Sequence, residues 1–427
     1  MKKKNKKIKQ EGFIKGIFSL IISQVLIKLF GLIYKLYLTN KDGFGDEGNA
    51  IYSSGFQIYA LLLTLSSIGV PNAVAKLVSE KISIGDNKSA NIIFKIAFIT
   101  FSFIGFIGTL ILFFGAEVIA NSFLQIPEAK ESLIALSPSI FFVSIISVIR
   151  GYFNGMQTMK ATANSQSLEQ FFKTVFTIII VQIIALISNL NTKLMAAGAN
   201  FATTLATIVC FLYLYKYYKE RSKDIGWKIY HSSSKRVEGP ILILKKILKI
   251  SIPMSFSSIL TSINKNVDSV TVIRGLKRIM TEKEAKIQYG ILSGKVDTLV
   301  TFPLSFNIAF ATALVPAISA SIAKRDYKTI KKRISFSLLI AIVIGMPCTF
   351  GMVIFAKPIL DFLFPNASMG ANIFRISAMS IIFIVLEQTV NRFIAWTWKN
   401  FCSCYFIINW SWNKNDIKFS FSFNSRK

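Results

Sequence analysis

The chain has 427 residues, of which 52% are apolar, and its mean hydropathy is +0.52. Runs of about 20 apolar residues with few charges recur along it, and soluble domains do not contain so many of them. The formal net charge of +29 would suggest nucleic-acid binding in a soluble protein, but the Lys and Arg residues fall mainly between the apolar runs. This placement argues against a nucleic-acid partner and indicates membrane topology and contact with anionic lipids.

The apolar runs predict about ten membrane-spanning helices before the sequence changes character. They lie near 13–38, 51–71, 91–115, 133–154, 168–190, 195–215, 247–271, 289–320, 334–357 and 372–391. The run after the basic N-terminus is too long for the apolar part of a signal peptide and has no small-residue cleavage site, so we interpret it as a retained first span. The N-terminus and the loops after even-numbered spans are basic, which predicts that the N-terminus and these loops lie on the cytoplasmic side of the membrane. The connection 274–286 is an exception, since it is basic but predicted outside.

Two similar segments indicate an internal duplication. Val70-Pro71 and Val315-Pro316 each end an apolar run and precede small residues and a Lys-rich turn, roughly 240 residues apart. A duplicated bundle of membrane helices is typical of secondary transporters, whose substrate path lies between the halves. The predicted divisions are an N-terminal lobe of six spans (1–215), a cytoplasmic inter-lobe loop (216–246), a C-terminal lobe of four spans (247–391) and a tail (392–427).

The sequence shows no convincing motif for catalysis or metal binding. The only histidine, His231, lies in a predicted loop, and the four cysteines are scattered without a zinc-binding pattern. The segment from Gly290 to Lys295 faintly resembles a phosphate-binding loop but is one residue too short, and Val296 replaces the Ser/Thr. We therefore expect no enzyme activity, no metal and no cofactor.

Charged residues inside the predicted spans are the main candidates for a functional site, because such charges need a partner, a water-filled cavity or access to the surface. Lys28 and Lys35 are seven residues apart and hence lie on one face of the first span. Such a pair of cations would suit an anionic substrate, for example a diphosphate. The alternative is that Lys35 reaches the outer surface while Lys28, the deeper of the two, pairs with an acid.

The eighth and seventh spans hold further candidates for the cavity. Lys265 and Asp268 could neutralise each other inside the bundle, and Lys295 could face either the cavity or water. The Pro residues that interrupt apolar runs, including Pro71 and Pro316, are usual in transporter helices that bend.

The remaining candidates are expected to have structural or gating roles. Arg150 lies at the cytoplasmic end of the fourth span, where an interfacial anchor is the simplest interpretation. Glu169 and Lys173 are spaced i,i+4 at the start of the fifth span, which favours a stabilising pair over a ligand site.

Several segments together resemble a known family. GLIYKLYLTN (31–40), LSSIGVPNAVAKLVSEK (65–81), RGYFNGMQ (150–157) and LVPAISASIAKRD (314–326) resemble the stage V sporulation protein B-like branch of polysaccharide-lipid flippases, related to MurJ-type lipid II flippases. The resemblance implies an all-α polytopic fold of the MOP (multidrug/oligosaccharidyl-lipid/polysaccharide) superfamily, a MATE-like two-lobe bundle with ten of an expected fourteen helices. It also implies that alternating access moves an undecaprenyl-diphosphate-linked oligosaccharide, a cell-wall or sporulation precursor, across the membrane.

The same resemblance points to site residues. First-span cations and a carboxylate after that span matter in such flippases, and Lys28, Lys35 and Glu47 occupy comparable places. The chain departs from the family at Asn154 and at the Ala-Thr-Ala of 161–163. The family's arginine in the eighth span has no clear match, and Lys295 is the nearest cation.

Other functions remain open from the sequence. A cation-coupled multidrug antiporter of the same superfamily would need acids buried in the N-terminal lobe, whereas the first three spans carry mainly Lys. A non-transporting membrane remnant is favoured only by the tail, and a membrane glycosyltransferase would need acidic clusters.

The tail predicts a break in the reading frame near Asn391. Four of the five Trp residues lie in 392–427. A Trp codon read one nucleotide later always gives glycine, and the shifted tail can then encode a Gly-rich turn and another apolar helix. We expect the polypeptide as written to be unstable or inactive.

Overall fold

The computed structural model describes residues 13–397 except 65–68, 231–237, 305–306 and 308–326, and the described residues form helices and short turns. The N-terminal bundle comprises α1 (Phe13–Asn40), α2 (Gly45–Leu63), α3 (Gly69–Ser83), α4 (Asn87–Val118), η2 (Ile119–Leu124), η3 (Pro127–Ala129), α5 (Lys130–Gly155), α6 (Met159–Ile187) and α7 (Thr192–Tyr230). It is followed by α8 (Pro240–Leu276), α9 (Glu282–Gly290), η4 (Ile291–Val296), α11 (Tyr327–Ile354), α12 (Ala356–Leu363), α13 (Ala371–Ala378) and α14 (Ser380–Thr397). Pro316 lies outside the described residues.

Local sequence signals set several of these boundaries. Asp86 caps α4, because its carboxylate accepts a hydrogen bond from the backbone N–H of Ser89 at 3.0 Å. Thr281 and Glu284 form a reciprocal capping box at the start of α9. Pro240 occupies the first turn of α8, where its missing N–H needs no partner.

Small residues allow the helices of the N-terminal bundle to approach closely. Gly151 and Gly155 of α5 face α3, where an added Cβ would meet Pro71 and Val78 respectively. Packing through small residues is the usual way to associate helices in lipid, where burial of apolar surface supplies little driving force. The contact places Pro71, in the first turn of α3, against α5.

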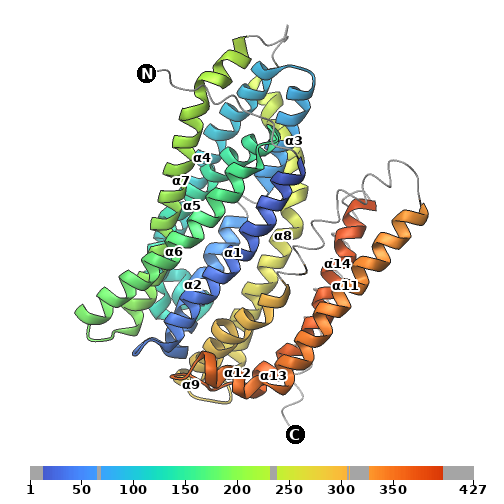
Figure 1. Ribbon diagram of the computed structural model, residues 1–427. Helices are drawn as coiled ribbons and strands as arrows, with labels where there is room; N and C mark the ends of the chain where they lie inside the picture. Colours follow the sequence, from blue (N-terminus) through green and yellow to red (C-terminus); the bar gives the residue numbers. More distant parts are fainter. Residues whose placement is uncertain (1–12, 65–68, 231–237, 305–306, 308–326, 398–427) are drawn as a thin grey trace, which may run out of the picture.

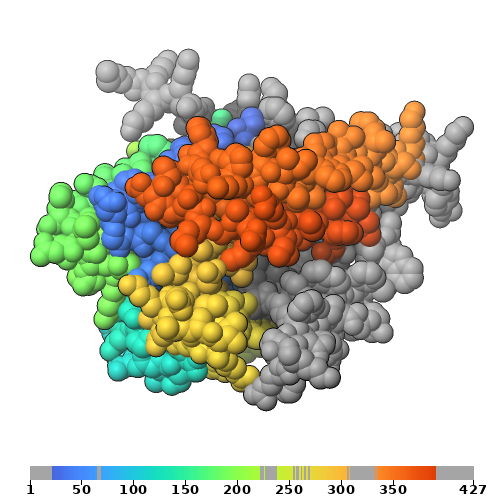
Figure 2. Space-filling view, turned by 90° about the horizontal axis from the view of Figure 1, so that it is seen from below, coloured from blue at the N-terminus to red at the C-terminus, as the bar shows by residue number. Residues whose placement is uncertain are grey.

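The described helices from α9 onward meet the N-terminal bundle at one end of the molecule, whereas α8 runs along α2, α3 and α4. Figure 1 shows α9, α12 and α13 gathered at the lower end beside α2, whereas α11 and α14 lean away from α8 toward the upper end. Seen from below in Figure 2, the segment that contains α12 and α13 (orange) lies directly against residues of the first two helices (blue) and α9 (yellow). We call this the α9 end, and the opposite end, near α3, the α3 end.

Seven helical stretches among the described residues are long and apolar enough to cross a membrane. They are Ile22–Asn40, Asn87–Leu124, Pro127–Gly155, Met159–Ile187, Thr192–Arg221, Ile334–Ile354 and Ala371–Val390. They coincide with seven of the ten predicted spans. The predicted spans 51–71 and 289–320 run into residues outside the described ranges, and 247–271 lies within α8, several of whose side chains are also outside them, so these three stay predictions.

The structure differs from the predicted inter-lobe loop. α7 continues to Tyr230 and α8 begins at Pro240, so most of 216–246 is helical. The polar residues after Tyr215 extend α7 beyond its apolar part, since Lys, Glu and Arg are good helix formers. Hydropathy locates the apolar part of such a helix and misses its polar extension.

Candidate functional site

Two buried lysines, Lys35 of α1 and Lys173 of α6, share one cluster of aromatic rings. Lys35 is 8% exposed and Lys173 is 6% exposed. The Lys35 ammonium lies 4.5 Å from the centre of the Tyr52 ring, and the Lys173 ammonium lies 4.3 Å from that of Phe56 and 5.2 Å from that of Tyr34. At these distances ring faces attract a cation, by about 0.5 to 2 kcal/mol each.

The three rings form one continuous wall. Tyr52 and Phe56 stack with their centroids 5.9 Å apart, and Tyr34 meets Tyr52 edge-on at 6.4 Å. The Tyr52 hydroxyl donates a hydrogen bond to the Tyr34 hydroxyl at 3.4 Å. The rings therefore contact both lysines, and we call this group the lysine–aromatic cluster (Tyr34, Lys35, Tyr52, Phe56 and Lys173).

The polar contacts of Lys35 are long. Its Nζ donates to Asn49 Oδ1 at 3.4 Å and to Ser53 Oγ at 3.5 Å, both beyond the usual range for such bonds. Among the described side chains, no carboxylate oxygen lies within 4 Å of the ammonium of Lys35 or of Lys173. Two buried cations with only weak partners create a site that would attract an anion.

Lys295 of η4 is buried in a different way. Its side chain is fully inaccessible, and its ammonium donates to Asp46 Oδ2 at 2.9 Å and to the backbone carbonyls of Ala367 at 2.6 Å and Met369 at 2.9 Å. These three acceptors match the three protons of an ammonium group. Lys295 thus joins the start of α2 to the loop between α12 and α13 at the α9 end.

Glycines allow this junction to form. A Cβ on Gly290 would clash with the backbone carbonyl of Asp46, and one on Gly294 would lie 2.6 Å from Asn49 Cγ. These two glycines, spaced i,i+4, therefore let α9 and η4 lie directly on α2. The segment that faintly resembled a phosphate-binding loop is thus a close-packing surface that ends in Lys295.

Hydrogen bonds from the end of α1 reinforce the junction. Asn40 Nδ2 donates to the carbonyl of Leu363 at 2.8 Å, and Asn366 Nδ2 donates to the carbonyl of Asn40 at 2.8 Å. The first two helices are therefore fastened to the C-terminal helices at the α9 end through both charged and neutral contacts.

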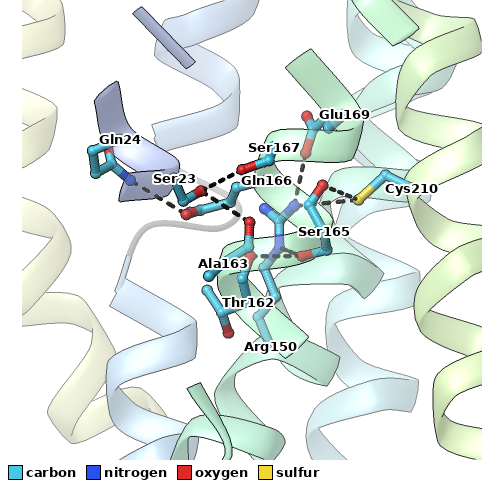
Figure 3. Close-up of polar contacts among 10 residues, drawn as sticks. All are labelled: Ser23, Gln24, Arg150, Thr162, Ala163, Ser165, Gln166, Ser167, Glu169 and Cys210. Atoms are coloured by element: carbon cyan, nitrogen blue, oxygen red, sulfur yellow. Dashed lines mark hydrogen bonds and ion pairs between the residues drawn. The ribbon is translucent and has the colours of Figure 1, made fainter. Parts of the chain in front are cut away.

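Arg150 forms a third polar cluster, inside the N-terminal bundle (Figure 3). Its guanidinium donates to Ser165 Oγ, to Glu169 Oε2 at 2.8 Å and to Cys210 Sγ at 3.2 Å. The Arg150 side chain is 12% exposed. It links α5, α6 and α7 rather than anchoring at an interface. The predicted Glu169–Lys173 pair is wrong, because Glu169 bonds Arg150 while Lys173 faces the aromatic wall.

The other predicted site residues have mixed outcomes. Lys28 is exposed and Lys35 is buried, so the predicted order of depth in the first span is reversed. Glu47 is half-buried, and its neighbour Asp46 forms the ion pair with Lys295. Lys265 and Asp268 lie in α8, but their side chains are outside the described residues.

The residues of α2 that complete the site were not predicted from the sequence. Asn49, Tyr52, Ser53 and Phe56 recur at spacings of three and four, which places them on one helix face. That face points toward Lys35 and Lys173. Tyr52, Ser53 and Phe56 lie within the predicted apolar run 51–71 and carry no charge, so a search for charges alone does not find them.

Among the described residues there is no group of three or more His, Cys, Asp or Glu side chains that could hold a metal ion.

This chain is similar in sequence to known protein families and to individual relatives. A family model described as polysaccharide biosynthesis protein matches residues 13–322, and one described as lipid II flippase MurJ matches residues 294–393. Stage V sporulation protein B of Bacillus subtilis is 25% identical over 382 residues, which cover 88% of this chain and 71% of that protein. Lipid II flippase MurJ of Bacillus subtilis is 24% identical over 394 residues, covering 89% and 72%.

The fold agrees with that of solved transporters. An inward-facing multidrug resistance MATE family transporter of the MOP superfamily superimposes with a TM-score of 0.65 at 14% identity, over 89% of this chain and 86% of that one. The helical arrangement is therefore the MATE-like fold of MOP-superfamily transporters, and the predicted fold class is confirmed. Because the first family model covers most of the sequence, the chain belongs to the polysaccharide biosynthesis protein family.

Proposed function

We propose that this chain is a flippase that moves an undecaprenyl-diphosphate-linked oligosaccharide, a lipid II-like or related cell-wall precursor, across the cytoplasmic membrane by alternating access. The single observation that carries the proposal is the lysine–aromatic cluster, with two buried ammonium groups and no carboxylate within 4 Å among the described side chains. A diphosphate supplies the anionic oxygens that these cations lack, and ammonium groups are strong phosphate ligands.

The position of the cluster also fits a transport path. Leu32 and Leu36, which flank Lys35 on α1, pack against the core of the C-terminal helices. Lys35 therefore lies close to the boundary between the two halves, where transporters of duplicated architecture bind their substrates. The Lys295–Asp46 junction closes the α9 end of this boundary, which the charge distribution predicts to be the outer side.

The alternative, a cation-coupled multidrug antiporter, needs a buried acid that is free to bind a cation. Asp46 and Glu169 are acids of the N-terminal bundle at buried or half-buried positions, and each forms an ion pair, with Lys295 and Arg150 respectively. Their pairing favours an anionic cargo over this alternative.

The test is translocation by the purified full-length chain in proteoliposomes. A fluorescent undecaprenyl-diphosphate disaccharide is placed in both leaflets, and its accessibility to a membrane-impermeant quencher is followed. If the predicted frame break in the tail leaves the chain active, it should speed the exchange of this lipid between leaflets, and Lys35→Gln with Lys173→Gln should abolish that exchange. Lys41→Gln is the matched control, since Lys41 bonds Gln182 at an exposed position outside the cluster.

Two outcomes would contradict the proposal. Exchange by wild-type protein that persists in the double variant would separate transport from the cluster. Binding of the lipid without any exchange would favour the non-transporting remnant, and the predicted frame break in the tail would then explain the loss.

A further inference from the structure

A second basic site lies at the α3 end, far along α1 and α2 from the junction at Lys295. It is a pocket of about 340 Å³ between α3, the start of α4 and the start of α8. Four lysines line it (Lys76, Lys81, Lys246 and Lys249) together with two carboxylates (Glu80 and Glu238). We call it the basic pocket.

One carboxylate neutralises two of the four lysines. Glu238 accepts from Lys81 of α3 at 3.1 Å through one oxygen and from Lys246 of α8 at 2.6 Å through the other. These two hydrogen bonds hold the pKa of the Glu238 carboxyl below its usual value, and the bond from Lys246 contributes more than the bond from Lys81. Glu238 therefore stays ionised and fastens α8 to α3.

The other two lysines have no such partner. Lys76 and Lys249 both line the pocket, and neither forms an ion pair with a described carboxylate. Their helices, α3 and α8, come from opposite sides of the predicted duplication. An anionic group between them would be held by two cations from two halves of the chain.

The remaining wall of the pocket is apolar and reaches the protein surface at one residue. Ile93, Ile243 and Ile250 line the inner part of the pocket, and Ile84, in the turn between α3 and α4, lines it while 67% exposed. A combination of cations with apolar walls and an adjoining exposed isoleucine suits an amphiphile more than a soluble anion.

From this geometry we propose that the basic pocket binds the phosphate headgroup of an anionic phospholipid, with Lys76 and Lys249 on the phosphate and an acyl chain along Ile84. The basic loops predict that this end faces the cytoplasm, where anionic headgroups attract lysines. The bound lipid bridges α3 and α8 and stabilises contact between the two halves at the α3 end. The basic pocket is separate from the lysine–aromatic cluster, so this proposal does not depend on the identity of the transported substrate.

The test is lipid binding to the purified full-length protein in detergent, measured by native mass spectrometry with dioleoyl phosphatidylglycerol. Since each lysine near an anionic headgroup contributes about 1 kcal/mol, Lys76→Gln with Lys249→Gln should weaken binding about thirtyfold. Lys76→Arg with Lys249→Arg keeps both charges and should retain binding, which also shows that the positions tolerate substitution.

A matched double variant controls for general surface charge. Lys95→Gln with Lys245→Gln removes two exposed lysines from α4 and α8 that do not line the pocket, and binding should change by less than about threefold. Unfolding temperatures in lipid-free detergent establish that each variant is folded.

Three results would overturn the proposal. Equal losses in the two Gln double variants would show only non-specific attraction to the basic surface. Undiminished binding in Lys76→Gln with Lys249→Gln would place the lipid elsewhere. If millimolar inorganic phosphate displaces phosphatidylglycerol through the same two lysines, the pocket is a site for a soluble phosphate.

Discussion

Two groups of buried lysines among the described residues differ in what surrounds them. Lys295 is fully enclosed, with one carboxylate and two carbonyls for its three protons, and its contacts join the two halves of the chain. Lys35 and Lys173 are nearly as buried but face ring systems and weak polar partners. A buried charge that is fully paired serves the fold, whereas one left without a counter-charge costs free energy and is expected to serve a ligand.

The same helix contributes to both groups. Asp46 lies in the first turn of α2, and Phe56 follows ten residues later, a distance of about 15 Å along the axis. A movement of α2 that breaks the Lys295–Asp46 junction would therefore also shift the aromatic wall beside Lys35 and Lys173. This arrangement offers a mechanical connection between the closed α9 end and the proposed substrate site.

The largest effect is expected from Asp46→Asn, which removes the charge partner of Lys295. An uncompensated buried ammonium should lower the free energy of unfolding by about 3 kcal/mol, measured by denaturant titration in mixed micelles. Glu47→Gln, one residue along, should change it by less than about 0.5 kcal/mol. Equal effects of the two substitutions would mean that the junction is not the stabilising element.

Arg150→Gln tests a paired cation that belongs to neither group of lysines. Loss of its charged hydrogen bonds to Glu169 and Ser165 should cost about 2 kcal/mol of unfolding free energy. The affinity for undecaprenyl diphosphate should stay at the wild-type value. A large fall in affinity with unchanged stability would instead place Arg150 in the substrate site.

Lys173→Met should change the free energy of unfolding in the opposite direction. Replacing a buried cation that lacks a carboxylate by an apolar side chain of similar length should raise the free energy of unfolding by about 1 kcal/mol. Lys295→Met, measured alongside, should lower it. If both substitutions destabilise the protein to the same extent, the proposed difference between the two groups of lysines is contradicted.

Glu238→Gln should have the smallest effect, because its lysine partners are partly exposed. Exposed ion pairs contribute about 0.2 to 1 kcal/mol. Its folded pKa lies below the unfolded value of about 4.3, so the contribution is present above that pH and is lost as the pH falls through the lower folded pKa. Unfolding curves of wild type and variant should therefore differ at pH 6 and converge near pH 3; a constant difference would exclude the charge as its cause.

Much of the fold could be predicted because hydropathy locates apolar helices directly. The same signal failed for the polar end of α7, which is helical without being apolar. Lys35 and Lys295 could be identified as candidates because charges inside spans are rare. Their partners could not be identified, since Asp46 lies 249 positions from Lys295 and the choice of Asp46 over Glu47 depends on helix rotation.

The frame break near Asn391 stays a prediction. Resequencing the DNA from codon 380 onward should reveal a single-nucleotide change that restores a Gly-rich turn and an apolar helix. An unchanged frame in independent DNA would show that the Trp-rich tail is genuinely encoded.

The most direct test of the contrast between the lysines is thermal unfolding of wild type and Lys35→Gln with Lys173→Gln, each with and without undecaprenyl diphosphate. Ligand at one hundred times its dissociation constant should stabilise the wild-type protein by about 2.7 kcal/mol. The double variant should be at least as stable as wild type without ligand and should not respond to it. Equal stabilisation of both proteins by the ligand would contradict the assignment of Lys35 and Lys173 as its binding site.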